Sequence, residues 1–249
     1  MNGLDDKTAI IIPIRMNSSR LPGKFHIDIA GKEMILHVID RARESKFTNI
    51  FVACDHQDHF NLVTSYGAKA VMTGTYHQSG SDRSYEALNI IDPNGKFEYI
   101  INLQGDMPFF NPETIAGVVQ ELEQAPEAEI ATMAARMEDI DDIKDHNVVK
   151  VVFNKKQHAL YFSRLPIPFS MDYAKANYFY HVGVYAYRRA ALKIYIELPQ
   201  SPLEITERLE QLRAIENGMI IRVGISKEIP ISVDVPEDLY YAREYARKL

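Results

Sequence analysis

The fold is decided by two adjoining stretches, the apolar run Thr8-Ala9-Ile10-Ile11-Ile12-Pro13-Ile14 and the polar loop Arg15-Met16-Asn17-Ser18-Ser19-Arg20-Leu21-Pro22-Gly23-Lys24 that follows it. A continuous apolar run rich in isoleucine predicts a strand that is buried on both faces of a sheet. Helical periodicity over residues 33–43 and a second strand over 49–54 come next. Strand, helix and strand in this order are typical of a parallel sheet. Such sheets bind ligands beyond the carboxyl ends of their strands, so the polar loop is a candidate site.

The same alternation continues along the chain. We expect helices over 56–66 and 81–91, strands over 69–72 and 98–103, and a helix that opens at Asn111-Pro112 and runs to residue 123. The sequence therefore predicts an α/β fold, with a mostly parallel sheet and helices on both of its faces.

From about Val148 the pattern changes to short β segments, over residues 149–153, 159–163 and 178–187. We expect these to form an inserted β-rich lobe, approximately residues 148–190, within a single domain that spans residues 1–249. A helix over 203–216, a strand over 219–225 and a C-terminal helix with Pro236 near its first turn complete the expected elements.

Composition limits the class of protein. The 249 residues include 28 Lys+Arg and 34 Asp+Glu, a formal net charge of −6, and this mild acidity argues against a nucleic-acid binder. No apolar run is long enough to insert into a membrane. The first residues lack the basic region of a signal peptide, and Cys54, the single cysteine, cannot form an intrachain disulfide. We therefore expect a cytoplasmic protein that handles a small molecule.

The polar loop after the first strand combines the cations Arg15, Arg20 and Lys24 with small polar residues. Polyphosphates are bound by such cations together with closely approaching backbone N–H groups. The loop is not a Walker A motif, because Phe25 follows Gly23-Lys24 and Ser18 stands where the upstream glycine is required. A solvated basic loop remains the alternative.

Two isolated carboxylates follow strands, Asp106 in Leu103-Gln104-Gly105-Asp106 and Asp234 in Ser232-Val233-Asp234. Carboxylates from different strand ends can share Mg²⁺, which prefers oxygen ligands and bridges to substrate phosphates. Together with the cationic loop, such a metal would serve phosphoryl or nucleotidyl transfer. Taken singly, each aspartate is more typical of a turn or a helix cap than of a metal site.

The segment Tyr76-His77-Gln78-Ser79-Gly80-Ser81-Asp82-Arg83 places a glycine turn at the start of a helix. It could bind an anion at the helix N-terminus, or its serines could simply cap the helix.

The pair His56 and His59 is not expected to bind a transition metal, because no second pair lies at zinc spacing, and we expect an exposed helix start there. No G-x-S-x-G elbow is present, so covalent catalysis is not expected.

A series of longer motifs covers nearly the whole chain in order. They are Ile12-Pro13-Ile14-Arg15, Ser19-Arg20-Leu21-Pro22-Gly23-Lys24, His77-Gln78-Ser79-Gly80-Ser81-Asp82-Arg83, Asn102-Leu103-Gln104-Gly105-Asp106, Val148-Val149-Lys150-Val151-Val152, Tyr161-Phe162-Ser163-Arg164, His181-Val182-Gly183-Val184-Tyr185, Leu209-Glu210-Gln211-Leu212-Arg213 and Val233-Asp234-Val235-Pro236-Glu237-Asp238. In these motifs the sequence resembles the 3-deoxy-manno-octulosonate (Kdo) cytidylyltransferases, also called CMP-Kdo synthetases. Tyr-Phe-Ser-Arg and Leu-Glu-Gln-Leu-Arg are the most specific of them.

The resemblance implies a cytoplasmic homodimer with a nucleotide-binding sheet like that of the nucleotide-diphospho-sugar transferases, the β-rich lobe being the dimer arm. It implies Mg²⁺-dependent transfer of CMP from CTP to the anomeric hydroxyl of Kdo, which gives CMP-Kdo and pyrophosphate for lipopolysaccharide or capsule biosynthesis. Arg15 and Lys24 would hold the triphosphate, and Asp106 and Asp234 the metal; these four are the implied catalytic residues.

The resemblance also assigns residues to the two substrates. Beside Arg15 and Lys24, the implied nucleotide-binding residues are Pro13, Ile14, Ser79, Gly80 and Arg83. The implied sugar-binding residues are Gln104, Arg164, His181, Tyr185, Glu210 and Gln211. Arg164 suits the sugar carboxylate as a bidentate partner, although it could instead pair with a structural acid.

The sequence departs from the family pattern at a few positions. Met107 replaces a glutamate, Cys54 a threonine and Phe25 a proline, and Tyr180 stands where a basic residue is common. None of these changes removes an implied catalytic residue. Met107 and Tyr180 leave open whether the acid sugar is Kdo, 8-amino-Kdo or a relative. A sialic-type sugar is the runner-up, and the motifs Tyr-Phe-Ser-Arg and Leu-Glu-Gln-Leu-Arg disfavour it. A catalytically silent nucleotide sensor is the alternative from another class, and it would predict loss of the basic loop or of a metal aspartate.

Overall fold

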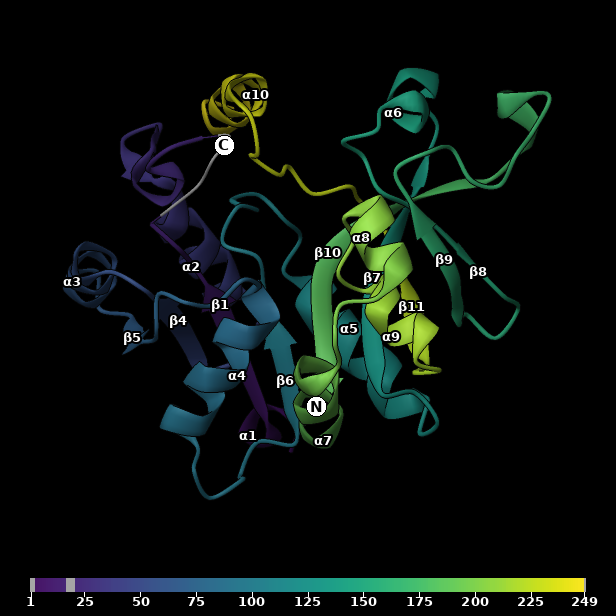
Figure 1. The fold of residues 1–249 in the computed structure, drawn as a ribbon. Helices are drawn as coiled ribbons and strands as arrows, with labels where there is room; N and C mark the ends of the chain where they lie inside the picture. The colour runs from purple at the N-terminus through teal and green to yellow at the C-terminus, as the bar shows by residue number, and fades with distance from the viewer. Residues whose placement is uncertain (1–2, 17–20, 249) are drawn as a thin grey trace. The chain divides into compact units, whose positions relative to one another are not determined.

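The computed structural model describes residues 3–16 and 21–248 and divides into two compact units (Figure 1). The first unit comprises Met1–Ile115 with Pro230–Leu249, and the second comprises Ala116–Ile229. The expected β-rich lobe, residues 148–190, lies inside the second unit. The loop residues Asn17, Ser18, Ser19 and Arg20 lie outside the described residues. That the chain forms a single domain stays a prediction.

The first unit is built on parallel strands in the order β6-β1-β4-β5. Strand β1 (Thr8–Pro13) is buried along its whole length and pairs with β4 (Ile50–Cys54) and β6 (Tyr99–Asn102), and β4 pairs in turn with β5 (Lys69–Met72). In register, Ile11 lies between Phe51 and Asn102. The isoleucine-rich run therefore forms the central buried strand that its composition predicts.

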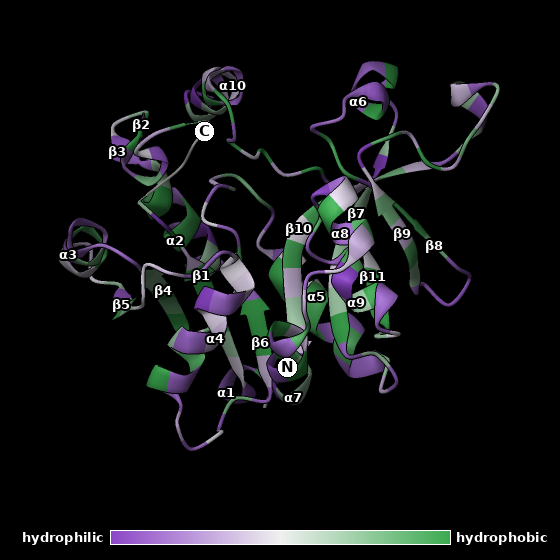
Figure 2. Ribbon diagram, viewed as in Figure 1, coloured by the Kyte–Doolittle hydropathy of each residue, from purple (hydrophilic) through white to green (hydrophobic). Residues whose placement is uncertain are grey.

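Helices connect these strands and cover the sheet. Helix α2 (Met34–Glu44) leads from β1 towards β4, α3 (Gln57–Ser65) from β4 to β5, and α4 (Gly80–Ile91) from β5 back to β6. Because crossovers between parallel strands are right-handed, the return through α4 covers the face opposite to α2 and α3. In Figure 2, α4 carries hydrophilic and hydrophobic bands in alternation, as an amphipathic helix on a sheet does. The predicted α/β fold with a mostly parallel sheet is confirmed.

The direction of the connections reverses between β1 and β6. From β1 the chain moves on to β4 and β5, whereas β6 on the other side of β1 is reached by the return crossover. In open α/β sheets, a ligand crevice lies at this switch point, beyond the carboxyl ends of the strands. Residues that follow Pro13 and Asn102 are therefore the ones that can meet a ligand.

Shorter elements complete the first unit. They are α1 (Leu4–Lys7), the 3₁₀ turn η1 (Lys24–His26), β2 (Asp28–Ile29), β3 (Lys32–Glu33), the start of α5 (Glu113–Gln124) and α10 (Pro236–Ala246). As expected, Asn111 caps α5, because its Oδ1 accepts the backbone N–H of Glu113 at 2.9 Å.

The second unit is a sheet of mixed direction. Strand β7 (Ile130–Met137) pairs parallel with β11 (Ile221–Ser226) and antiparallel with β10 (Tyr178–Arg188). Strand β8 (Lys150–Phe153) pairs with β10 and with β9 (Ala159–Ser163). The helical segments are α6 (Ile140–Lys144), η2 (Tyr173–Lys175), α7 (Arg189–Glu197), α8 (Pro202–Glu207) and α9 (Leu212–Glu216).

The helix expected over residues 203–216 is in fact two helices, α8 and α9. Arg208 ends α8 in the left-handed conformation, with φ 55°, and this breaks the continuous helical hydrogen bonding. Strand β7 and helices α6 and α7 are not among the predicted elements. Within residues 3–16 and 21–248, no helix combines the length and the apolar character that crossing a bilayer requires.

Candidate functional site

A cavity lies at the switch point of the first unit. Its walls come from the carboxyl ends of β1 and β6, from η1, from the start of α4 and from the segment before α10. The lining residues are Pro13, Ile14, Arg15, Lys24, Phe25, His77, Gln78, Ser79, Gly80, Arg83, Gln104, Gly105, Asp106 and Asp234. All the predicted catalytic and nucleotide-binding residues, and Gln104 of the predicted sugar-binding set, therefore line one cavity.

Lys24 and the two predicted metal aspartates are in direct contact. The Lys24 ammonium lies 2.7 Å from Oδ2 of Asp106 and 2.7 Å from Oδ1 of Asp234. The Lys24 side chain is only 6% exposed, whereas those of Asp106 and Asp234 are 23% and 38% exposed. Carboxylates separated by more than one hundred residues in the sequence thus converge on a single ammonium group in the cavity lining.

The backbone fixes this convergence. The N–H of Val233 donates to the carbonyl oxygen of Asp106 at 2.9 Å, and Phe109 forms an antiparallel bridge with Ile231. The carboxylate of Asp238 accepts the N–H groups of Asp234 and Val235 at 2.8 and 3.0 Å, which caps helix α10. The positions of both aspartates are therefore set by main-chain hydrogen bonds and not only by Lys24.

Gly105 allows the two strand ends to approach each other closely. A Cβ atom there would lie 2.7 Å from Cγ2 of Ile14 and 2.9 Å from Cε1 of Phe25. Gly80 has a similar role at the start of α4, where a Cβ would lie 3.2 Å from Cγ of Pro13. These glycines let the ends of β1, β6 and α4 surround a small cavity.

The basic wall of the cavity is formed by Arg15 and Arg83. Arg15 is exposed, whereas Arg83 is 3% exposed and donates to Oγ1 of Thr73 at 2.7 Å and to the carbonyl oxygen of Gly74 at 3.0 Å. Burial lowers the pKa of the Arg83 guanidinium, and the nearby Asp55 carboxylate opposes that shift. Several Arg83 donors are thus used within the protein, and a contact with nucleotide stays a prediction.

Asp55 connects this wall to the loop after β1, and the sequence did not reveal that role. Its Oδ1 accepts the N–H of Met16 at 2.9 Å, and its Oδ2 lies 3.3 Å from Nη2 of Arg83. One carboxylate therefore fixes both the residue after Arg15 and the Arg83 side chain. Its position immediately after strand β4 was the available signal, since that strand end faces the same edge of the sheet.

The start of α4 shows the capping arrangement that was one of the two interpretations of this segment. Oγ of Ser79 accepts the N–H of Asp82 at 3.1 Å. Next to it, His77 is hydrogen-bonded to Glu86, which also accepts the N–H of Gly74 at 2.8 Å. Burial raises the pKa of Glu86, but these two hydrogen bonds outweigh it and hold the pKa below its ordinary value. Ser79 and Gly80 also line the cavity, and anion binding by this helix start stays a prediction.

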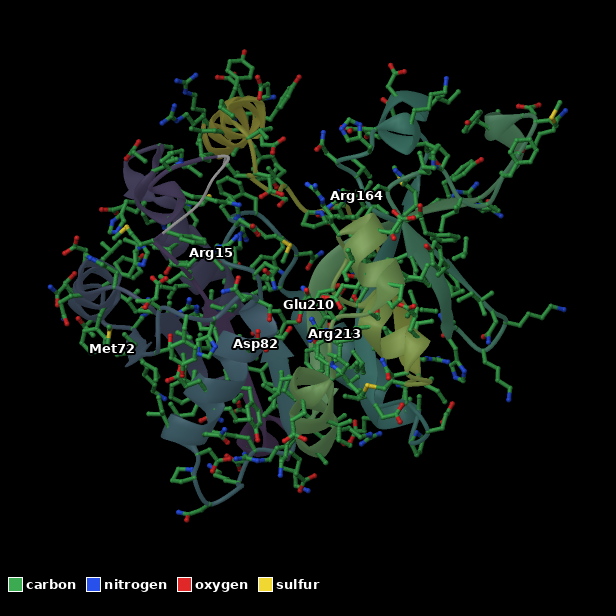
Figure 3. All side chains as sticks on the ribbon, viewed as in Figure 1. Arg15, Met72, Asp82, Arg164, Glu210 and Arg213 are labelled. Carbon is green, nitrogen blue, oxygen red and sulfur yellow. The ribbon has the colours of Figure 1, made fainter. Side chains whose placement is uncertain are left out.

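The other predicted sugar-binding residues belong to the second unit, and Figure 3 shows Arg164 and Glu210 there. Arg164 is held by backbone carbonyls: Nε donates to Glu207 and Nη1 to His146, each at 3.0 Å. The Glu207 carboxylate accepts the N–H of Arg164 at 3.0 Å. These contacts fix the direction of the guanidinium.

His181 and Tyr185 lie on one face of β10, on either side of an irregularity in its pairing with β7. Their rings are 5.3 Å apart. Nε2 of His181 lies 3.0 Å from the hydroxyl of Thr132, and burial lowers the His181 pKa to about 3. The Thr132 hydroxyl also lies within hydrogen-bond distance of the carbonyl oxygens of Val182 and Val184. His181 is therefore neutral at pH 7.

Glu210 and Gln211 follow α8. The carbonyl oxygen of Glu210 accepts the hydroxyl of Tyr195 at 2.9 Å, and Gln211 is 8% exposed. In the same motif, Arg213 forms a bidentate pair with Glu204, at 2.8 and 2.6 Å. Arg213 therefore stabilises the joint between α8 and α9.

The expected exposed helix start at His56 and His59 is correct only for His56, which caps α3 by accepting the N–H of Asp58. His59 is 1% exposed and stacks on His26 at 4.8 Å, because it is on the inner face of the helix. Burial lowers its pKa to about 4. Over the ranges 3–16 and 21–248, no three histidine, cysteine or acidic side chains are grouped so that they could hold a metal.

Known proteins support the class that this geometry suggests. A family model described as "Cytidylyltransferase" matches residues 9–228. The chain belongs to this cytidylyltransferase family.

The relatives point to one branch of the family. The chain is 44% identical over 242 residues to the 3-deoxy-manno-octulosonate cytidylyltransferase of Brucella anthropi, with 95% of both chains covered. It is 43% identical over 244 residues to the enzyme of the same name from Brucella canis, covering 96% of this chain and 95% of the relative. The resemblance inferred from the motifs is confirmed.

Solved structures agree with the fold. A CMP:2-keto-3-deoxy-manno-octonic acid synthetase complexed with CTP matches with a TM-score of 0.90 and 39% identity, covering 98% of this chain and 100% of the other. A cytidylyltransferase from Leptospira borgpetersenii serovar Hardjo-bovis matches with a TM-score of 0.63 at 14% identity, over 98% of this chain and 87% of the other, and shows the fold alone.

Proposed function

We propose that this chain transfers CMP from CTP to the anomeric hydroxyl of Kdo, which gives CMP-Kdo and pyrophosphate. The observation that carries the proposal is the convergence of Lys24, Asp106 and Asp234 on one point of a cavity at the switch point of the sheet. Relatives more than 40% identical over nearly the whole chain carry the name of this activity. The enzyme is a nucleotidyltransferase.

In the reaction, the anomeric hydroxyl attacks the α-phosphorus of CTP and pyrophosphate leaves. Arg15 and Lys24 line the cavity and are the cations that neutralise the triphosphate as charge moves to the leaving group. Arg83, anchored by Asp55, Thr73 and Gly74, keeps the wall next to them positive. Positioning and charge neutralisation are the main contributions that a protein makes to such a transfer.

Asp106 and Asp234 fit a site for Mg²⁺. Their oxygens already converge on a cation, the Lys24 ammonium, and carboxylate oxygen is the donor that Mg²⁺ prefers. Two protein ligands are enough, because Mg²⁺ in such sites keeps water and phosphate oxygens as its other ligands. The chemistry that Mg²⁺ supplies when bound is neutralisation of charge at the phosphate and easier loss of the proton of the attacking hydroxyl.

For the acid sugar, we propose that Arg164 binds the carboxylate and that Gln104, His181, Tyr185, Glu210 and Gln211 are further sugar-binding residues. The support for Arg164 is its fixed guanidinium, which makes bidentate binding of a carboxylate favourable. His181 contributes as a neutral group, since burial keeps it unprotonated.

The departures from the family pattern do not favour another sugar. Met107 is 3% exposed, and Tyr180 packs against the apolar cluster of Met137, Ile143 and Tyr178. Both side chains are used in packing, so we keep Kdo as the substrate over 8-amino-Kdo and sialic acids. The retained Arg15, Lys24, Asp106 and Asp234 do not favour a catalytically silent nucleotide sensor.

We further propose that the enzyme works as a cytoplasmic homodimer. Large apolar side chains on the segment after β9 are exposed: Leu165 by 68%, Phe169 by 84% and Met171 by 91%. Strongly exposed large apolar side chains are typical of a protein–protein interface, and the lobe that carries these three is the one implied as the dimer arm. Sedimentation analysis of the wild type and of Phe169→Asp tests this: a dimer that becomes a monomer is expected.

The activity is tested by pyrophosphate release with CTP and Mg²⁺, in parallel reactions with Kdo, 8-amino-Kdo and sialic acid. Release with Kdo is the expected result. Release only with the amino sugar would keep the reaction and change the substrate. No release with any of the three, although CTP binds, would favour the nucleotide sensor.

A further inference from the structure

The Lys24 ammonium occupies the place between the two carboxylates. It is 2.7 Å from Asp106 and 2.7 Å from Asp234, and its side chain is almost completely buried. Both contacts join opposite charges at short distance, so they are among the stronger hydrogen bonds of the site. The free protein thus places a lysine ammonium against both carboxylates and offsets one of their two negative charges.

A divalent cation cannot share this place with the ammonium. Mg²⁺ binds oxygen at about 2.0–2.1 Å, so a metal that took Oδ2 of Asp106 and Oδ1 of Asp234 as ligands would occupy the place of the ammonium. Two positive groups so close to each other would also repel. Binding of the metal by these two oxygens therefore requires the Lys24 side chain to leave.

The triphosphate offers the displaced lysine a new partner. Lys24 and Arg15 line the same cavity, and the positive Arg83 side chain is close by, so an anion that enters there meets the ammonium directly. The backbone of Lys24 is held in the η1 turn after Gly23, but its four-carbon side chain can rotate without moving that turn. A phosphate oxygen can therefore replace the carboxylates as the acceptor for the ammonium.

We propose that Lys24 closes the metal site of the free enzyme and opens it when CTP binds, so that CTP promotes binding of the divalent cation. The proposal rests on the proposed function, because it takes Asp106 and Asp234 as the metal ligands. By linkage, the cation strengthens CTP binding by the same factor.

The size of the effect follows from how completely Lys24 occupies the carboxylates. If the metal-competent arrangement, with Lys24 away, is populated at about 1–10%, the apparent affinity for the metal is reduced about 10- to 100-fold. Removing the ammonium removes this reduction. A protein without Lys24 should accordingly bind a divalent cation tightly even in the absence of nucleotide.

The test is direct binding of Mn²⁺ without nucleotide, measured from the free Mn²⁺ signal in electron paramagnetic resonance. The full-length wild type is compared with Lys24→Met, with Lys24→Met/Asp106→Asn and with the matched control Lys32→Met. Lys32 is paired with Asp40 at 2.6 Å and does not line the cavity, so its replacement removes the same charge elsewhere. We expect Lys24→Met to bind Mn²⁺ about 10- to 100-fold more tightly than the wild type and the control.

Asp106→Asn in the Lys24→Met background should abolish the gain. Equal affinities of Lys24→Met and Lys32→Met would overturn the proposal, and pyrophosphate release that still requires Asp106 would then leave the proposed function intact. A gain that persists without Asp106 would overturn both the proposal and the assignment of Asp106 as a metal ligand. If Lys24→Met is poorly folded because its carboxylates repel, Lys24→Gln and thermal unfolding provide a second readout: Mn²⁺ should raise its Tm but not that of the wild type.

Discussion

Replacing Asp55 by asparagine tests the anchoring of the basic wall. Asp55 is 9% exposed, and its two oxygens hold the Met16 N–H at 2.9 Å and Nη2 of Arg83 at 3.3 Å. Asparagine keeps one oxygen acceptor but loses the negative charge that faces the Arg83 guanidinium, whose side chain is only 3% exposed. Loss of one partner of a buried ion pair costs about 3–5 kcal/mol.

Two features reduce this cost for Asp55→Asn. The contact with Arg83 is long, and Nη1 of Arg83 keeps its hydrogen bonds to Thr73 and Gly74. We therefore expect a loss of about 2–3 kcal/mol, at or just below the lower limit of that range. In a chain of this length, each kcal/mol lowers the Tm by about 2–4 °C, so a fall of roughly 4–12 °C is expected.

The assay combines thermal unfolding with CTP titration of the reaction. Because Met16 follows Arg15, loss of the anchor should also raise the apparent KM for CTP while the Kdo dependence changes little. Asp58→Asn is the matched control, since it removes the same charge from a nearby carboxylate that is 67% exposed. If Asp55→Asn and Asp58→Asn have the same Tm and the same CTP dependence, Asp55 does not anchor this wall.

Five further variants test the metal ligands, the sugar contact, the packing at Gly105 and the buried histidine. Asp106→Asn or Asp234→Asn should lower turnover by about 100-fold or more, while part of the CTP binding is retained. Near-normal turnover in both variants would show that these aspartates are not metal ligands. Arg164→Lys should chiefly raise the KM for Kdo, because an ammonium cannot reproduce the donors now directed at the carbonyl oxygens of Glu207 and His146. An unchanged KM for Kdo would show that Arg164 does not bind the sugar. Gly105→Ala should cost about 1–3 kcal/mol of unfolding free energy by forcing apart Ile14 and Phe25, as equilibrium denaturation would show. Burial lowers the pKa of His59 to about 4 in the folded state, against an ordinary value of 6.5. The folded protein should therefore lose about 1.4 kcal/mol of stability per pH unit as the pH falls from about 6.5 to 4. His59→Gln should flatten this dependence of stability on pH.

The first unit could be predicted closely because local and long-range signals agree there. The run from Thr8 to Pro13 is apolar throughout and is buried throughout, as its composition requires. Strand–helix alternation then determines the parallel order, and the strand ends locate the cavity. Arg15, Lys24, Asp106 and Asp234 were found in this way, and all of them line the cavity.

The features that the sequence did not reveal depend on tertiary contacts. Asp55 acquires its role from Met16 and Arg83, which only the fold brings near it. Arg208 breaks the expected helix although its own propensity for helix is high, because the left-handed turn there is fixed by the surrounding chain. The burial of His59 depends on the stacking of His26, which comes from η1. Periodicity shows which face of a helix is apolar, but not which distant ring will cover it.

Transfer of CMP to the sugar can be followed by ³¹P NMR of the enzyme with CTP, Mg²⁺ and Kdo. We expect the CTP signals to be replaced by pyrophosphate and, in equal amount, by a single phosphodiester signal from CMP-Kdo, and we expect omission of Kdo to abolish both products. Formation of CDP with orthophosphate, or pyrophosphate that appears without the phosphodiester, would contradict attack of the sugar hydroxyl on the α-phosphorus.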